Sequence, residues 1–322
     1  MLIESVPNVS EGRRLDVVGR MAAAIESDDG VFLLDRTSDA SHNRSVFTIA
    51  GEHQPVMAAL ERLVEVAIGE IDMDRHTGEH PRIGAVDVIP FVPLAATTMD
   101  DCVEMARDFG ARVASRYSLP VYLYANAATR LERVKLADVR RGQYEGLKNE
   151  IDEPGRAPDF GPTRMHPSAG AVAVGARPFL IAYNINLASD DVELAKRIAR
   201  RVRESGGGLP RVQANGFWIE ELGRAQVSMN ILDFGLTPVW LVWETVRAVA
   251  AEDGVELAES ELIGLAPLAA FLAVADHVDA PTEDPVERRL AAAAAFLRLR
   301  DFSPMQALEL RLEAARATGR RR

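Results

Sequence analysis

The sequence has little cysteine and little lysine, and it has no long hydrophobic run. Cys102 is the single cysteine, so no disulfide can form within the chain, which fits a reducing, cytoplasmic location. No apolar stretch reaches the roughly 20 residues that a membrane span requires, and Glu4 stands where a secretory leader would carry a basic residue. The formal net charge of -11 argues against a duplex nucleic-acid surface. We therefore expect a cytoplasmic protein that binds neither membranes nor nucleic acid.

The sequence does contain enough apolar residues for a large core. Hydrophobic residues make up 48% of the 322 residues and charged residues 26%, which is the profile of a soluble globular protein with room for two domains. Apolar periodicity predicts the order β-α-β-β-α-β twice, first between residues 2 and 92 and again between residues 179 and 265. This order is that of a ferredoxin-like unit. We therefore predict an α+β fold with two ferredoxin-like α/β sandwich subdomains.

The predicted elements define the expected domains. The first unit has strands at 2–6, 31–34, 44–50 and 83–92, with helices at 14–26 and 56–68. The second has strands at 179–187, 212–219, 225–232 and 261–265, with helices at 190–203 and 238–251. A helix at 100–115, a strand at 120–124 and a polar connection at 127–167 lie between the units, and helices at 287–299 and 303–317 precede a basic, frayed tail at 320–322. We expect subdomains at 1–177 and 178–300, and a helical C-terminal extension at 301–322.

The densest polar cluster comes directly before a predicted strand. It runs Arg75-His76-Thr77-Gly78-Glu79-His80-Pro81-Arg82. His76 and His80 have a spacing at which a helix would present both imidazoles to a metal ion, but Gly78 and Pro81 disfavour a continuous helix, so we expect no metal. Two interpretations stay open on these residues alone. One is proton transfer by a histidine near neutral pH, and the other is a surface loop whose charges pair with one another.

Other segments are less specific. Asn43-Arg44 leads into a predicted strand and is typical of a turn. The glycines at 161, 170 and 175 either permit a close backbone approach to a flat ligand or form a linker. Gly206-Gly207-Gly208 follows a helix rather than a strand, the reverse of a dinucleotide-binding loop. Because the Gly-x-Ser-x-Gly and Walker A patterns are missing, serine hydrolysis and P-loop chemistry have no support.

Several segments resemble glutamate formimidoyltransferases. They are residues 6–12 (Val-Pro-Asn-Val-Ser-Glu-Gly), 43–48 (Asn-Arg-Ser-Val-Phe-Thr), 76–91 (beginning His-Thr-Gly-Glu-His-Pro-Arg), 120–124 (Pro-Val-Tyr-Leu-Tyr), 157–162 (Ala-Pro-Asp-Phe-Gly-Pro), 175–187 (beginning Gly-Ala-Arg-Pro-Phe) and 226–230 (Gln-Val-Ser-Met-Asn). The resemblance runs from residue 3 to about residue 310. The run at 76–82 is highly specific to that family.

The resemblance implies a reaction and a catalytic residue. The family transfers a formimidoyl group between N-formimidoyl-L-glutamate and tetrahydrofolate in histidine degradation, with tetrahydrofolate as co-substrate and without a metal. It implies two ferredoxin-like subdomains, usually in a homodimer, with folate and glutamate-type molecules as partners. The second histidine of His-Thr-Gly-Glu-His, His80, corresponds to the catalytic residue. Residues 161–170 and 208–217 correspond to the folate-binding stretches.

Further site residues are expected around His80. Supporting roles are expected for Asp39, Arg75, His76, Glu79, Arg82 and Asp87. The substrate-binding candidates are Asn43, Arg44, Thr77, Gly161, Pro162, Thr163, Ser168, Gly170, Arg177, Asn184, Arg211, Gln213 and Asn230. Of the cations, Arg44, Arg75, Arg82 and Arg177 are candidates for binding the carboxylates of glutamate. One of the acids Asp39, Glu79 and Asp87 could stabilise an imidazolium. The chain departs from the family pattern at Thr37, where a further acid is expected, and at residues 164–169.

Three other activities remain alternatives. A related folate enzyme could use 5-formyltetrahydrofolate, either as a formyl donor or as the substrate of a cyclo-ligase. A metal-dependent hydrolase would contain a stoichiometric metal, and a non-catalytic folate-binding protein would bind folate without turning it over.

Overall fold

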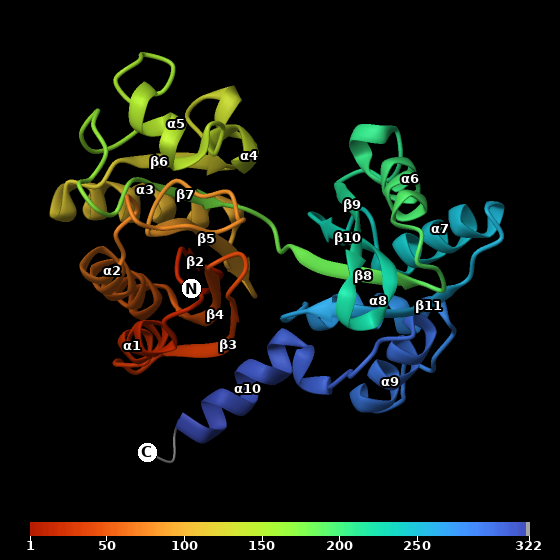
Figure 1. Cartoon of the computed structure of the whole chain (residues 1–322). Coiled ribbons are helices and arrows are strands. Elements are labelled where there is room, and N and C mark those ends of the chain that lie inside the picture. The colour runs from red at the N-terminus through yellow and green to blue at the C-terminus, as the bar shows by residue number, and fades with distance from the viewer. Residues whose placement is uncertain (320–322) are drawn as a thin grey trace. The chain divides into compact units, whose positions relative to one another are not determined.

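The chain divides between Arg177 and Pro178 into two units in the computed structural model, which describes residues 1–319 (Figure 1). Residues 1–177 are called unit 1, and the described residues from 178 onward are called unit 2. The basic tail predicted at 320–322 lies outside the described residues. Within residues 1–319, no helix is both long and apolar enough to cross a membrane.

Unit 1 contains the predicted ferredoxin-like arrangement. Its elements are β1 (Leu2–Ser5), β2 (Asn8–Val9), α1 (Leu15–Ile25), β3 (Val31–Asp39), β4 (Arg44–Glu52), α2 (His53–Glu70) and β5 (Val86–Leu94). The first strand, β1 continued by β2, lies antiparallel between β4 and β5, and β3 pairs with the other side of β4. The first strand therefore lies between the third and the fourth, as the βαββαβ prediction requires.

Two parallel strands extend this sheet beyond β5. The added elements are α3 (Met99–Tyr117), β6 (Val121–Ala125), the 3₁₀ turn η1 (Leu131–Arg133), α4 (Leu136–Val139), α5 (Gln143–Glu150) and β7 (Val172–Ala176). β7 pairs in parallel with β5 on one side and β6 on the other. A linker was one interpretation of the glycines before residue 177, but Gly175 belongs to β7. A Cβ atom at Gly175 would lie 2.5 Å from the ring of Tyr124, so the glycine makes room for that ring.

The polar connection predicted at 127–167 is wrong in part, because it contains η1, α4 and α5. These helices are short and have few apolar residues, so no helical periodicity is visible in the sequence. Val139 and Leu147 nevertheless pack with Tyr122 and Tyr124 of β6 in one apolar cluster. The residues of α1, α2 and α3 belong to another cluster, and Figure 1 shows α3 on the opposite side of β6 from α4 and α5.

Unit 2 repeats the same strand arrangement. Its sheet is formed by β8 (Ile181–Leu187), β9 (Val212–Ile219), β10 (Arg224–Ile231) and β11 (Leu257–Ile263), in the order β11-β8-β10-β9. The first strand again lies between the third and the fourth. The helices α6 (Val192–Val202) and α7 (Val239–Glu252) complete the βαββαβ order. Asp191 begins α6 as predicted, because its Oδ1 accepts a hydrogen bond from the backbone N–H of Leu194 at 3.0 Å.

Among the predicted strands, β3 and β11 differ most in their bounds from the structure. β3 continues to Asp39 instead of ending at residue 34, because the end of this edge strand is exposed and its polar side chains gave no apolar signal. β11 begins at Leu257 instead of residue 261. Its Glu259 and Glu261 accept hydrogen bonds from Asn186 and Asn184 of β8, so polar residues occupy one face of this strand.

The end of the described chain is helical, as predicted. It contains α8 (Leu268–His277), α9 (Val286–Leu297), η4 (Pro304–Gln306) and α10 (Leu308–Gly319). Ser260 of β11 ties this region to the sheet, since its hydroxyl donates to the backbone oxygen of Leu297 at 2.6 Å. Two further 3₁₀ turns, η2 (Glu204–Gly206) and η3 (Glu220–Leu222), lie on either side of β9.

Candidate active site

Three loops of unit 1 meet around the side chain of Asn43. They are residues 10–12 after β2, the β3–β4 turn at 39–44, and residues 76–82 before β5; together they are called the three-loop cluster. Asn43 Oδ1 accepts a hydrogen bond from Gly12 N at 3.0 Å, and its Nδ2 donates to the backbone oxygen of Thr77 at 2.9 Å. Asn43 has the left-handed φ of 48°, which asparagine tolerates better than most residues. Asn43 therefore connects all three loops.

Glycines allow these loops to touch backbone to backbone. A Cβ atom at Gly12 would lie 2.2 Å from the backbone oxygen of Asp39, and one at Gly78 would lie 2.4 Å from the backbone oxygen of His42. Neither contact can be relieved by turning a side chain, because both partner atoms belong to the backbone. The glycine in His-Thr-Gly-Glu-His is thus required for packing.

Arg82 anchors the third loop to α5. Its guanidinium makes a bidentate ion pair with Glu145, at 2.6 Å to Oε1 and 3.0 Å to Oε2, and Nη1 also donates to Gln143 Oε1 at 3.1 Å. The remaining N–H groups donate to His76, with Nε to Nδ1 at 3.2 Å and Nη2 to the backbone oxygen at 3.4 Å. Arg82 is only 6% exposed. All its donors have protein partners, so it is placed as a positioning residue and not as a cation for a substrate carboxylate.

Both ring nitrogens of His76 are occupied. Because Nδ1 accepts from Arg82, the proton lies on Nε2, which donates to the backbone oxygen of Asn43 at 3.1 Å. Burial is the main cause that lowers the pKa of His76, and the backbone oxygen of Asn43 opposes it. His76 is therefore a neutral link between two loops.

His80 differs from His76 in having its nitrogens free. It is half-buried, and its ring nitrogens make no hydrogen bond to any residue among 1–319. Burial, followed by the positive charges of Arg44 and Arg140, lowers the pKa of His80 from 6.5 to about 3. His80 is consequently neutral at physiological pH and can accept a proton.

Arg44 is a cation without an anion. It is partly buried at the start of β4, and no carboxylate or side-chain hydrogen-bond acceptor pairs with its guanidinium among residues 1–319. Burial and the nearby Arg140 lower the pKa of Arg44. A buried charge is costly unless it is paired. The unpaired guanidinium beside His80 therefore favours an anionic ligand.

Arg140 and Asp87 form a buried ion pair beside these residues. Asp87 is 2% exposed and accepts a hydrogen bond through Oδ2 from Arg140, while its Oδ1 accepts one from Ile83 N at 2.9 Å. Asp87 is thereby a structural support for the segment that precedes β5.

The other expected supporting residues are exposed. Asp39 lies at the end of β3, and its Oδ1 accepts a hydrogen bond from His42 N at 2.8 Å, which is the main cause that lowers the pKa of Asp39. Glu79 has no side-chain partner among residues 1–319. The side chain of Arg75 is 88% exposed and lies 3.4 Å from Asp72. Of these three, Asp39 has the most defined geometry.

The end of the 161–170 segment contacts residues on either side of the third loop of the three-loop cluster. The backbone of Gly170 forms an isolated bridge with Gly84, and the backbone oxygen of Ser168 accepts a hydrogen bond from Met73 N at 2.8 Å. Gly170 has a φ of 72°, and a Cβ atom there would lie 2.5 Å from the backbone oxygen of Ile83. The segment therefore approaches the residues that follow His80.

The start of this segment and Arg177 lie at the two ends of β6 and β7. Gly161 packs against the backbone of Leu119 before β6, with Pro162 half-buried and Thr163 exposed beyond it. Arg177 follows β7, and a hydrogen bond and charge from it oppose the burial that raises the pKa of Tyr124.

The remaining substrate-binding candidates belong to unit 2. Asn184 of β8, Gln213 of β9 and Asn230 of β10 lie on the face of the sheet that carries polar residues, and Gln213 is the direct cross-strand neighbour of Asn230. Arg211 lies just before β9 with a φ of 60°. The apolar face of the same sheet packs against α6, so the polar face is the one available for hydrogen bonding within unit 2.

Sequence reasoning missed four residues of the site. Glu145, Gln143 and Arg140 lie in or beside short helices that were predicted to be a loop, more than 50 residues from their partners. His42 was not among the predicted site residues. Its position next to Asn43-Arg44, a segment already singled out, was the available signal.

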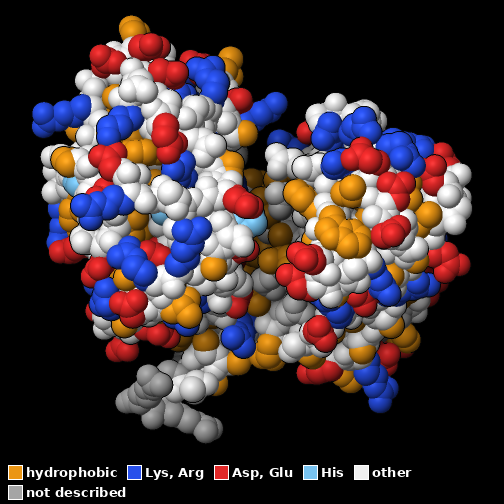
Figure 2. Space-filling view, viewed as in Figure 1, with side chains coloured by type: hydrophobic (Ala, Val, Ile, Leu, Met, Phe, Trp, Pro, Cys, Tyr) orange, Lys and Arg blue, Asp and Glu red, His pale blue; other side chains and the backbone are white. Residues whose placement is uncertain are grey.

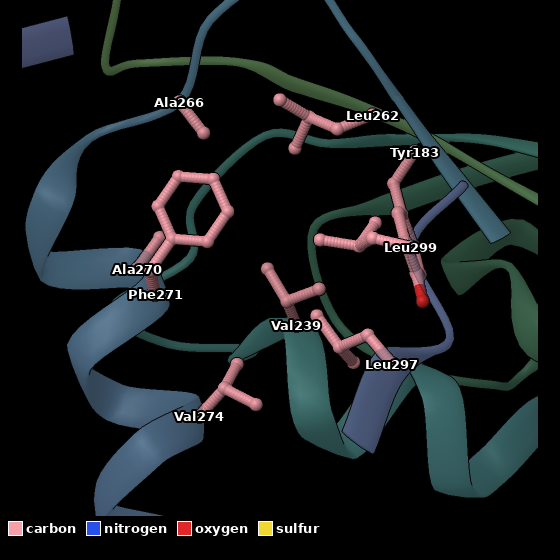
Figure 3. Close-up of a pocket in the computed structure, with 9 residues that line it drawn as sticks. All are labelled: Tyr183, Val239, Leu262, Ala266, Ala270, Phe271, Val274, Leu297 and Leu299. Carbon is pink, nitrogen blue, oxygen red and sulfur yellow. The ribbon is translucent and has the colours of Figure 1, made fainter. Parts of the chain in front are cut away.

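Two cavities of the described residues are lined by residues other than His80. One, of about 10 Å³, is an apolar void in unit 2 between residues such as Val239, Phe271 and Leu299 (Figure 3). The other, of about 310 Å³, lies in unit 1 beside α4, and two of its arginines, Arg133 and Arg156, pair with Asp159 and Glu150. Among the described residues, no group of three or more histidine, cysteine or acidic side chains could hold a metal ion. On the face drawn in Figure 2, acidic and basic side chains are interspersed over each unit.

Models of two adjoining family domains match the chain. The N-terminal subdomain of the formiminotransferase domain matches residues 2–177, and the formiminotransferase domain matches residues 182–303. The chain belongs to the formiminotransferase family. The two matched regions correspond to units 1 and 2, and the three-loop cluster of this formiminotransferase-family chain lies in the first.

Curated relatives match this chain over most of its length. The chain is 44% identical over 276 residues to the glutamate formimidoyltransferase of Streptococcus pyogenes serotype M1, which covers 86% of this chain and 92% of the relative. It is 43% identical over 316 residues to that of Thermoplasma acidophilum, covering 98% of both. The formimidoyltransferase-cyclodeaminase of Sus scrofa is 44% identical over 277 residues, covering 84% of this chain and 51% of the relative.

Proposed function

We propose that this chain transfers the formimidoyl group between N-formimidoyl-L-glutamate and tetrahydrofolate, giving 5-formimidoyltetrahydrofolate and L-glutamate in histidine degradation. The family and the two stand-alone relatives named glutamate formimidoyltransferase support this reaction. The observation that carries it is that a neutral His80, which has no hydrogen-bond partner, lies near the guanidinium of Arg44, which has no anionic partner among residues 1–319.

Arg44 gives the site its affinity for a carboxylate-bearing substrate. Its guanidinium can donate two parallel hydrogen bonds to a glutamate carboxylate, and no acidic side chain among residues 1–319 pairs with it. Binding of this anion has a second effect. It offsets the positive charge that lowers the pKa of His80, so the substrate itself makes His80 a better base.

His80 acts as the general acid and base of the transfer. As the folate nitrogen attacks the amidine carbon, the neutral imidazole accepts the proton which that nitrogen loses. This kind of catalysis contributes about 10²–10⁴-fold, and the positioning of two bound substrates supplies much of the remainder. The anchors of the loop, Arg82 and Asn43, keep His80 in place during both steps.

Tetrahydrofolate is the co-substrate, and the reaction as written requires no metal or redox cofactor. For its recognition within unit 1 we propose Ser168 and Gly170, whose segment contacts Met73 and Gly84 on either side of the third loop. As a separate candidate within unit 2 we propose the amide side chains of Asn184, Gln213 and Asn230. Amides suit the alternating donors and acceptors of a pterin ring. We further propose that the protein works as a cytoplasmic homodimer, which analytical ultracentrifugation of the purified chain tests.

An assay with defined donors tests the proposed reaction. The wild-type protein is mixed with tetrahydrofolate and either formimidoylglutamate or formylglutamate, and the absorbance of the folate product is followed. A third mixture contains 5-formyltetrahydrofolate and ATP, which tests a cyclo-ligase. Rapid turnover with formimidoylglutamate alone supports the proposal. Turnover only in another mixture would contradict it.

The same assay tests Arg44. Arg44→Gln should raise KM for formimidoylglutamate by about 10–100-fold, since hydrogen bonds to a charged group contribute about 1.5–3 kcal/mol. The KM for tetrahydrofolate should change little. Arg36→Gln is the matched control, because Arg36 is an exposed arginine on β3 outside the three-loop cluster. An unchanged KM in Arg44→Gln would remove Arg44 from the substrate site.

A further inference from the structure

A second histidine faces His80 across the three-loop cluster. The ring of His42, in the β3–β4 turn, lies 6.4 Å from that of His80 between centroids, with an interplanar angle of 63°. The two imidazoles come from segments more than 30 residues apart in sequence, and the contacts of Gly78 and Asn43 hold those segments together. The proposed mechanism gives His42 no role.

Asp39 fixes the orientation of His42. Its Oδ2 lies 3.0 Å from His42 Nδ1, and its Oδ1 accepts a hydrogen bond from the backbone N–H of the same residue at 2.8 Å. The Oδ2 contact is close but lies off the ideal hydrogen-bond direction, so its effect is mainly that of charge. Nδ1 is buried, whereas Nε2 is neither buried nor bonded to any residue among 1–319. His42 therefore presents Nε2 as its reactive nitrogen.

The charged groups beside the two histidines are of opposite sign. The carboxylate of Asp39 lies beside His42, with Oδ2 3.0 Å from Nδ1. His80 has Arg44 and Arg140 as its strongest charged neighbours, and both favour the neutral ring. Two titratable groups with environments that differ in this way are suited to separate acid and base roles.

We propose that His42, oriented by Asp39, is a second catalytic residue of this chain and, in place of His80, donates the proton to the leaving nitrogen, while His80 accepts the proton from the attacking nitrogen. This inference rests on the proposed formimidoyl transfer, which moves one carbon between two nitrogens. The bond between the folate nitrogen and the amidine carbon forms, and the proton of that nitrogen passes to neutral His80. The bond between this carbon and the glutamate nitrogen then breaks. Its electron pair stays on the glutamate nitrogen, which takes a proton from the His42 imidazolium and leaves as the amine of L-glutamate.

The active site then returns to its starting state by proton exchange. After one transfer His80 is protonated and His42 is neutral, so the total number of protons on the two rings is unchanged. One proton passes from His80 to His42, directly or through water. No oxidant, reductant or metal enters this cycle.

Chemical rescue distinguishes proton transfer from a structural role. His42→Ala should lower kcat by about 10²–10⁴-fold, and added imidazole should restore part of this loss, because a free imidazole can occupy the space and carry the proton. KM for both substrates should stay within about twofold of wild type. His53→Ala, at the start of α2 and outside the three-loop cluster, is the matched control and should keep the wild-type kcat with and without imidazole.

The pH profile supplies an independent test. The pH dependence of kcat/KM in His42→Ala and in Asp39→Asn should differ from that of wild type, since the first variant removes the proton donor and the second removes the carboxylate beside it. The groups facing His42 that also enter this profile are Asp39, Arg44, Arg140 and His80.

These experiments distinguish a failure of the role proposed for His42 from a failure of the proposed formimidoyl transfer. Wild-type kcat in His42→Ala would overturn the inference, and so would a slow variant that imidazole does not rescue and whose pH profile matches that of wild type. Both results leave the proposed function intact. A wild-type protein that transfers no formimidoyl group would refute the proposed function, and the second proton donor with it.

Discussion

His80 should make the folded protein lose stability in mild acid. Burial, Arg44 and Arg140 lower its pKa from 6.5 to about 3 in the folded protein. Between these values the unfolded chain binds a proton at this residue and the folded chain does not. The contribution is therefore fully present above about pH 6.5 and is lost as the pH falls towards about 3. At about 1.4 kcal/mol for each pH unit, the loss at pH 5 would be about 2 kcal/mol, and solvent screening of this half-buried ring reduces it to about 1 kcal/mol.

Urea unfolding at pH 7.5 and pH 5 measures this contribution. In His80→Gln, the difference in unfolding free energy between the two pH values should be about 1 kcal/mol smaller than in wild type, because glutamine does not titrate. His53→Gln is the control and should retain the wild-type difference. If wild type and His80→Gln lose the same free energy between pH 7.5 and pH 5, the folded protein does not hold His80 in its neutral form and the reasoning is refuted.

Three further predictions concern the loop anchors. Glu145→Gln removes the carboxylate that holds Arg82, so the unfolding free energy should fall by about 1–2 kcal/mol; an unchanged urea midpoint would show that this ion pair does not stabilise the fold. Asn43→Ala should be about 1 kcal/mol less stable than Asn43→Gly, because both lose the side-chain hydrogen bonds but only alanine resists the φ of 48°; equal stabilities would contradict the strain. Gly78→Ala should lower kcat on the order of 100-fold by displacing the His80 loop, whereas Gly19→Ala in α1, where a Cβ atom meets nothing within 4 Å, should keep it; equal kcat values would mean that the close backbone contact is dispensable.

Local sequence patterns were sufficient to predict the βαββαβ order in each unit, but not β7, α4 and α5 of unit 1. In α6, for example, Leu194, Ile198 and Val202 repeat on one face and are all buried. Periodicity of this kind directly reports which side of an element faces the core. It fails where polar residues are partly buried, as in β11, whose Glu259 and Glu261 accept hydrogen bonds from asparagines, and where helices are short, as in α4 and α5.

The candidate site was predictable only where its residues are neighbours in sequence. The run at 76–82 singled out His80, and Gly78 and Pro81 correctly argued against a continuous helix there. The partners of this run come from far along the chain, since Glu145 reaches Arg82 across 63 residues. Such contacts depend on the tertiary fold. The spacing of His76 and His80 does not show that both ring nitrogens of His76 are hydrogen-bonded while those of His80 are free.

The roles of the two histidines lead to the central claim, that His80 performs the proton transfer. The most direct measurement is kcat of His80→Gln with formimidoylglutamate and tetrahydrofolate, together with the Kd for tetrahydrofolate of the same protein. The account predicts a loss of kcat on the order of 10²–10⁴-fold with Kd within about twofold of wild type. Turnover by His80→Gln at the wild-type rate would contradict it.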